Sequence, residues 1–132
     1  MAVRQLYEAS TGGKVKLADV FLTIQGEALF SGLPTIFIRT AYCPFACDWL
    51  GDGHGCDTGF TKEKHQIEVK YEMSPVEVLE FIQKVKQWRT PYVCLTGGEP
   101  LVDREALSLV ALLVAKGYEV DIETSGLVPF SD

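Results

Sequence analysis

Three cysteines lie close together at positions 43, 47 and 56, in the stretch AYCPFACDWLGDGHGCDT. Thiolates spaced in this way bind metal in proteins, either as ligands of an iron–sulfur cluster or as ligands of zinc. Three thiolates hold three irons of a [4Fe–4S] cluster and leave the fourth iron open to another ligand. His54 lies in the same loop, so Cys43, Cys47, His54 and Cys56 also suit a closed tetrahedral zinc site. The loop is therefore either catalytic or structural.

Length, composition and charge exclude several classes of protein. The chain has 132 residues, of which 47% are apolar and 23% are charged, as expected for one globular domain. A net charge of −6 argues against nucleic acid as a partner. No apolar run reaches the roughly 20 residues of a membrane span, and residues 1–10 lack the apolar core of a signal peptide. We expect a cytoplasmic protein. In that reducing compartment, clustered cysteines are more often metal ligands or catalytic thiols than disulfide partners.

The rest of the chain alternates between strand and helix patterns. PTIFIR and PYVCL are rich in β-branched and aromatic residues, as buried strands are. Ser74-Pro75-Val76-Glu77 is a capping box with proline at the first helical position, and Asp103 is a second N-cap. The expected elements are strand 34–39, helix 74–88, strand 91–95, a helix from 103 that stops at 117, and strand 118–123.

This order predicts an α/β fold, with a parallel sheet and helices on its outer face. In such sheets, functional residues lie at the carboxyl ends of the strands. The three strand ends carry the cysteine loop, the turn Thr96-Gly97-Gly98-Glu99-Pro100 and the loop Glu123-Thr124-Ser125-Gly126. We expect these loops to meet at one edge, with the glycine turn exposing backbone N–H groups that suit a carboxylate or phosphate.

Five motifs in order give the chain a specific resemblance to a known family. It resembles radical S-adenosylmethionine (SAM) enzymes and, within that superfamily, most resembles the 7-carboxy-7-deazaguanine synthase family. The motifs are Thr23-Ile24-Gln25-Gly26-Glu27, Pro34-Thr35-Ile36-Phe37-Ile38-Arg39, Cys56-Asp57-Thr58, Thr96-Gly97-Gly98-Glu99-Pro100 and Ile122-Glu123-Thr124-Ser125-Gly126.

The resemblance implies a partial radical SAM (β/α) barrel with about three of six strand–helix units. We expect residues 1–132 to form a single domain, the N-terminal part of such a barrel, with an inserted cysteine loop over 43–58. The chain would then be a fragment, or a second subunit would complete it.

The resemblance also implies the cofactors. Cys43, Cys47 and Cys56 would bind a [4Fe–4S] cluster, and Thr58, with Asp57 beside it, would bind Mg²⁺. The residues expected to contact SAM are Gly55, Cys56, Asp57, Gly97, Gly98, Glu99 and Ser125.

By the same resemblance, the substrate is 6-carboxy-5,6,7,8-tetrahydropterin. It would rearrange by ring contraction, with loss of ammonia, to 7-carboxy-7-deazaguanine in queuosine and deazapurine biosynthesis. Arg39 offers the two-donor fork that matches a carboxylate. The cluster and SAM would carry the chemistry without a further catalytic residue. A flavodoxin-like donor would supply the electrons, and the protein would form a homodimer. The expected substrate contacts are Ile24, Gln25, Gly26, Glu27, Arg39 and Thr96.

Two departures from the family pattern affect this interpretation. The cysteines are spaced C-x₃-C-x₈-C rather than C-x₃-C-x₂-C, which inserts residues 50–55 before Cys56. Ala28 stands where glycine usually follows Gln-Gly-Glu. The insertion makes Gly55 the residue directly before the third cysteine.

Alternative interpretations stay open. The chain could be another radical SAM enzyme, such as a glycyl-radical activase, or a zinc-binding module without enzymatic activity. Arg39 could form an ordinary ion pair, and Glu123 is as compatible with a structural role as with ligand contact. Gln25-Gly26-Glu27 could be a tight turn, and Cys94, inside an apolar strand, is expected to be a core residue rather than a ligand.

Overall fold

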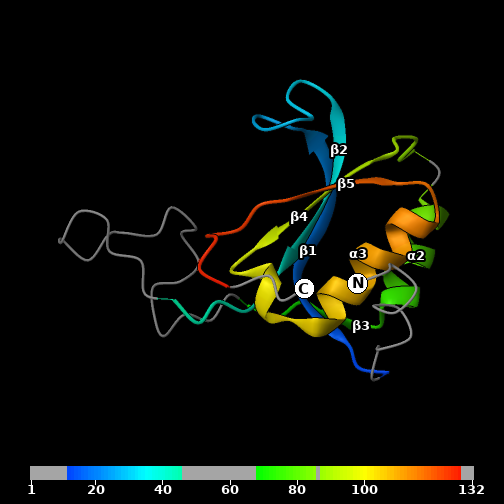
Figure 1. Cartoon of the computed structure of the whole chain (residues 1–132). Helices are drawn as coiled ribbons and strands as arrows, with labels where there is room; N and C mark the ends of the chain where they lie inside the picture. The colour runs from blue at the N-terminus through cyan, green and yellow to red at the C-terminus, as the bar shows by residue number, and fades with distance from the viewer. Residues whose placement is uncertain (1–11, 46–67, 86, 129–132) are drawn as a thin grey trace.

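The structure is a computed structural model that describes residues 12–45, 68–85 and 87–128. Five strands in these residues form one sheet with the spatial order β3-β1-β2-β4-β5 (Figure 1). β2, β4 and β5 are parallel neighbours, whereas β1 is antiparallel to both β2 and β3. The strands are β1 (Val15–Ile24), β2 (Pro34–Thr40), β3 (Tyr71–Met73), β4 (Tyr92–Gly97) and β5 (Glu119–Ile122).

The parallel half of the sheet confirms the predicted α/β fold, and β1 and β3 extend it with antiparallel strands that were not predicted. β1 contains a register irregularity between Leu17 and Asp19, where it pairs with β2. Such a bulge interrupts the alternation of side chains by which a strand is recognised in a sequence. β3 is only three residues long. Neither strand therefore has a clear periodic pattern.

Both predicted helices are present, with the predicted N-caps. Helix α2 (Pro75–Lys84) begins with the capping box: Ser74 N–H donates to Glu77 Oε2 at 2.7 Å, and Glu77 N–H donates to Ser74 Oγ at 3.3 Å. The helix ends before residue 88, the predicted limit, and Trp88 instead packs edge-on against Phe81.

The turn after β4 leads through the short 3₁₀ helix η1 (Pro100–Val102) into helix α3 (Arg104–Ala115). The Asp103 carboxylate accepts a hydrogen bond from Glu105 N–H at 2.9 Å, which satisfies a free donor of the first turn. Gly117 follows the helix with a φ of 89°, a conformation that glycine adopts easily. None of the helices in the described residues is long and apolar enough to cross a membrane.

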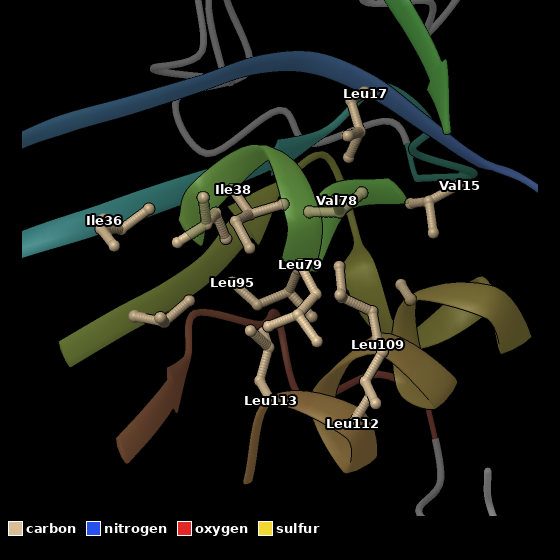
Figure 2. Packing of buried hydrophobic residues seen from close by; sticks show 13 residues of the cluster. Val15, Leu17, Ile36, Ile38, Val78, Leu79, Leu95, Leu109, Leu112 and Leu113 are labelled. Carbon is tan, nitrogen blue, oxygen red and sulfur yellow. The ribbon is translucent and has the colours of Figure 1, made fainter. Parts of the chain in front are cut away.

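The hydrophobic core lies between one face of the sheet and the two helices. α2 and α3 lie together on that face (Figure 1). Ile36, Ile38 and Leu95 point from the sheet toward Leu109 and Leu113 of α3 (Figure 2), and all five are fully buried. Burial of each such side chain contributes roughly 1.5–3 kcal/mol to folding. This face therefore stabilises the fold.

The opposite side, called here the second face of the sheet, carries the alternate residues of the same strands. Phe21 and Phe37 stack there with ring centroids 5.4 Å apart, and Arg39 lies over Phe21 at 5.9 Å. Thr96 of β4 is the parallel register partner of Arg39, so both side chains project from this face. The second face thus combines aromatic, cationic and hydroxyl groups.

The loop between β1 and β2 packs against the second face. Its ends are closed by two backbone hydrogen bonds, Gln25 N–H to Leu33 O at 3.0 Å and Gly32 N–H to Gln25 O at 2.8 Å. The Phe30 ring packs on Tyr92 of β4 with a centroid separation of 4.7 Å. Gln25-Gly26-Glu27 is thus the first part of a hairpin loop.

Ala28 in this loop has a φ of 59°, which explains why glycine is usual at the position. We expect Ala28→Gly to increase the free energy of unfolding by about 1 kcal/mol, because it removes the strain of a left-handed backbone. Urea denaturation measures the change. Ala115→Gly, at an exposed position in the last turn of α3, is the matched control and should destabilise the protein instead. Equal destabilisation by both changes would refute strain at Ala28.

Candidate functional site at the carboxyl ends of the parallel strands

The carboxyl ends of β2 and β4 are joined by backbone hydrogen bonds. Gly98 N–H donates to Thr40 O at 3.3 Å, and Glu99 N–H donates to Tyr42 O at 2.9 Å. The Thr40 hydroxyl also donates to Thr96 O at 3.3 Å in a buried position. The glycine turn and the start of the cysteine loop therefore meet at one edge of the sheet, as predicted.

The two glycines of this turn leave no space for side chains. Gly97 has a φ of 143°, and a Cβ there would overlap Thr40. A Cβ on Gly98 would lie 2.7 Å from Cys43 Cβ and would overlap the Tyr42 carbonyl group. Glycine is thus required at both positions, because the turn packs directly on the residues that lead to the first cysteine.

The expectation that this turn exposes its N–H groups is wrong for Gly98 and Glu99. Both N–H groups donate to carbonyl oxygens of the β2 end, so they are not available to a carboxylate or phosphate. Gly97, Gly98 and Glu99 remain predicted SAM contacts, but the N–H groups of Gly98 and Glu99 cannot serve as the donors.

The cysteine loop is described only as far as residue 45. Cys43 is half-buried directly after β2, with its Sγ 3.9 Å from Phe45 O. Among residues 12–45, 68–85 and 87–128, no three His, Cys, Asp or Glu side chains are grouped closely enough to hold a metal ion. The other residues predicted for this loop lie outside the described residues: Cys47, His54, Gly55, Cys56, Asp57 and Thr58.

Glu99 carries a buried carboxylate that connects β4 to the loop after β5. Its side chain is 1% exposed. Thr124 Oγ1 donates to Glu99 Oε1 at 2.7 Å, while Ser125 N–H and Oγ donate to Oε2 at 2.9 and 2.6 Å. Burial acts to raise the pKa of Glu99, but the hydrogen bonds from Ser125, Thr124 and Leu101 outweigh it, so its pKa lies below the ordinary value. Glu99 is therefore ionised at neutral pH.

Glu123 brings together two of the predicted substrate contacts. Its carboxylate accepts hydrogen bonds from Gln25 Nε2 at 3.1 Å and from Thr96 Oγ1 at 2.8 Å. Gln25 and Thr96 are themselves buried, and Gln25 Oε1 also accepts from Gly26 N–H at 2.8 Å. The structure thus gives Glu123 a role in holding these two side chains, which the sequence pattern alone did not distinguish from ligand contact.

The other predicted substrate contacts lie around this group. Arg39 is next to Thr96 in the parallel register of β2 and β4. Ile24 and Glu27 are exposed, as is Gly26 between Gln25 and Glu27. Arg39 and Thr96 therefore belong to the second face of the sheet, whereas Ile24 is the last residue of β1 and Gly26 and Glu27 lie in the loop that follows it.

Cys94 is a core residue, as predicted. It is fully buried in β4. Burial raises the pKa of its thiol well above the ordinary range, and the negative charges of Glu123 and Asp121 add to the effect. A thiol that stays protonated is a poor metal ligand and a poor nucleophile.

Sequence reasoning missed three contributors to the site: Thr40, Tyr42 and Thr124. Thr40 and Tyr42 act mainly through backbone carbonyl groups, which any residue provides. The Thr124 hydroxyl reaches Glu99 across the sheet edge. Only the Thr-Ser pair after strand 118–123 could have indicated a hydrogen-bonding partner for a buried carboxylate.

Comparison with known proteins places this geometry in a class. Residues 37–130 match the family model of the Radical SAM superfamily. The chain therefore belongs to the radical SAM superfamily.

Within this superfamily, the chain is similar to 7-carboxy-7-deazaguanine synthases. The enzyme of Methanospirillum hungatei is 39% identical over 125 residues, which are 94% of this chain and 47% of that protein. The enzyme of Thermoplasma acidophilum is 37% identical over 112 residues, 85% of this chain and 47% of that protein. The crystal structure of QueE from Escherichia coli has a TM-score of 0.69 at 30% identity, over 96% of this chain and 58% of that one. The chain spans about half the length of the curated relatives it matches.

Membership of the superfamily implies a [4Fe–4S] cluster and SAM. The described residues fit these groups in two respects. Cys43 lies just beyond the end of β2, where its thiol can serve as a cluster ligand, and the Gly97–Gly98 turn packs against this segment without side chains. The arrangement agrees with the partial radical SAM barrel expected from the motifs.

Gly98→Ala tests whether the close packing of the turn positions the first cysteine. We expect reconstituted iron to fall several-fold and the free energy of unfolding to drop by about 1–3 kcal/mol, because the new methyl group overlaps Tyr42 and Cys43. Iron analysis after anaerobic reconstitution and urea denaturation measure the two effects. Gly26→Ala is the control, since a Cβ there has no neighbour within 4 Å. Full iron content in the Gly98 variant would contradict the packing argument.

The low pKa of Glu99 predicts how stability depends on pH. A carboxylate whose pKa is lower in the folded state than in the unfolded state stabilises the protein at pH values above its unfolded pKa of 4.5. This stabilisation is lost as the pH falls through the folded pKa. Glu99→Gln removes the titrating group. We expect the difference in free energy of unfolding between wild type and variant to be constant from pH 7 to about 5 and to shrink at lower pH. A difference that is independent of pH down to the acid transition would be inconsistent with a charged Glu99.

Proposed function

We propose that this chain is the N-terminal part of a radical SAM synthase that converts 6-carboxy-5,6,7,8-tetrahydropterin into 7-carboxy-7-deazaguanine. The reaction is a ring contraction with loss of ammonia, in queuosine and deazapurine biosynthesis. The single observation that carries the proposal is the convergence of Gln25 and Thr96 on Glu123, beside Arg39 and next to the glycine turn. The names of the similar proteins support the same reaction.

The donors and acceptors of the second face suit a carboxylated pterin. The Arg39 guanidinium provides two parallel N–H donors for a carboxylate. The hydroxyl proton of Thr96 is used by Glu123, so Thr96 Oγ1 can only accept from a substrate N–H or O–H group. Phe21 and Phe37 provide an aromatic surface beside Arg39 for a flat heterocycle. Ile24, Gly26 and Glu27 would approach the substrate from the end of β1 and the β1–β2 loop.

The cofactor site would be built around the strand ends. Cys43, Cys47 and Cys56 would hold the cluster, and when bound the cluster and SAM supply a radical that removes a hydrogen atom from the substrate. Gly97, Gly98 and Ser125 would bind SAM together with the loop segment Gly55-Cys56-Asp57. Thr58, with Asp57 beside it, would hold Mg²⁺ through hard oxygen ligands.

We infer the cellular context from the same resemblance. The protein would work in the cytoplasm, take electrons from a flavodoxin-like donor and form a homodimer. The acidic net charge of −6 disfavours nucleic acid and membrane surfaces as partners.

Arg39→Lys tests the substrate assignment in the full chain. The variant keeps the positive charge but loses the planar fork, so we expect affinity for 6-carboxytetrahydropterin to fall about tenfold, with iron content and SAM affinity unchanged. Equilibrium binding under anaerobic conditions measures affinity, and chromatography of reaction mixtures detects 7-carboxy-7-deazaguanine. Arg104→Lys, at an exposed position in α3, is the matched control.

Two results would overturn the proposal. One is a wild-type chain that binds the pterin no better than it binds the same pterin without its carboxylate group. The other is an Arg39→Lys chain with wild-type affinity for the carboxylated pterin.

A further inference from the structure

The Glu99 carboxylate uses its hydrogen-bonding capacity entirely within the protein. A carboxylate has about four lone-pair positions, and Glu99 accepts four hydrogen bonds. Thr124 and Ser125 donate three of these hydrogen bonds, and Leu101 N–H donates the fourth to Glu99 Oε1 at 3.1 Å. With 1% exposure and no acceptor position left, this side chain has no capacity to bind SAM directly.

The two hydroxyl groups that Glu99 engages are oriented by it. Each donates its one proton to the carboxylate, and each accepts a hydrogen bond from its own loop: Gly126 N–H to Thr124 Oγ1 at 3.2 Å, and Leu127 N–H to Ser125 Oγ at 3.3 Å. Residues 124 to 127 are exposed. The conformation of this exposed loop therefore depends on a buried charge in the turn that follows β4.

The same residue connects the loop to the segment before Cys43. Its backbone N–H bonds to Tyr42 O at 2.9 Å. The ends of β2, β4 and β5 are thus connected through one residue, and a change in the position of Glu99 would be transmitted both to Ser125 and to the start of the cysteine loop.

From these contacts we propose that Glu99 is a positioning residue that acts through Ser125. It holds Ser125 Oγ so that only an acceptor lone pair is available, which selects an N–H or O–H donor on the bound ligand. The assignment of that ligand as SAM rests on the proposed function. The Ser125 hydroxyl, and not the Glu99 carboxylate, is then the group that contacts the ligand.

A first experiment tests the positioning without any ligand. Amide hydrogen exchange is measured on the full chain as wild type, Glu99→Gln and Glu119→Gln, the last being an exposed glutamate of β5. The amide nitrogen of glutamine donates rather than accepts, so we expect the Ser125 N–H to exchange about tenfold faster in Glu99→Gln only. Unchanged exchange at Ser125 in a folded Glu99→Gln protein overturns the proposal.

A second experiment tests the ligand contact. SAM affinity of the reconstituted protein is measured for Glu99→Gln, Ser125→Ala and the double variant. We expect each single change to weaken SAM binding about tenfold and the double variant to be no weaker than either, because both remove the same contact. Multiplied losses in the double variant overturn the proposal, since Glu99 would then act on SAM independently of Ser125.

The two experiments separate this inference from the proposed function. A wild-type chain that binds no SAM, with Ser125 exchange still dependent on Glu99, contradicts the proposed function and leaves the positioning role supported. If Glu99→Gln does not fold, Ser125→Ala replaces it, because Ser125 is exposed and its backbone N–H still donates to Glu99. Wild-type SAM affinity in Ser125→Ala then refutes the inference.

Discussion

The arrangement of the candidate site depends on one buried charge, the Glu99 carboxylate. Burying an ionised group without partners is strongly unfavourable, so the donors around Glu99 must stay in place for the strand ends to stay together. Three of the four donors come from the loop after β5, while the backbone of Glu99 is bonded to the end of β2. The geometry of the candidate site and folding stability are therefore coupled at this residue.

The two faces of the sheet have separate tasks. The face covered by α2 and α3 is apolar, and its close-packed Ile, Leu and Val side chains make the sheet a rigid support (Figure 2). The second face carries Arg39 and Thr96, with Gln25 and Glu123 connected across it. Because side chains alternate along a strand, a single run such as PTIFIR contributes to both tasks.

Local signals in the sequence predicted the parts of the fold that local physics determines. The capping box at Ser74 and Glu77 and the N-cap at Asp103 begin helices at the predicted positions. The bulge in β1 concealed that strand, and the N–H groups of Gly98 and Glu99, which were expected to be exposed, are instead bonded to the β2 end. The link from Gln25 to Glu123 joins residues far apart in the chain, so no local pattern could reveal it.

The most direct test of the account is an electron paramagnetic resonance measurement on the anaerobically reconstituted, reduced chain, with and without SAM. A [4Fe–4S] cluster with one open iron at Cys43, Cys47 and Cys56 should give a brown protein with about four irons, whose spectrum changes when SAM is added. A colourless protein that contains one zinc, has no cluster signal and does not respond to SAM would contradict the account. It would instead indicate a structural zinc site completed by His54.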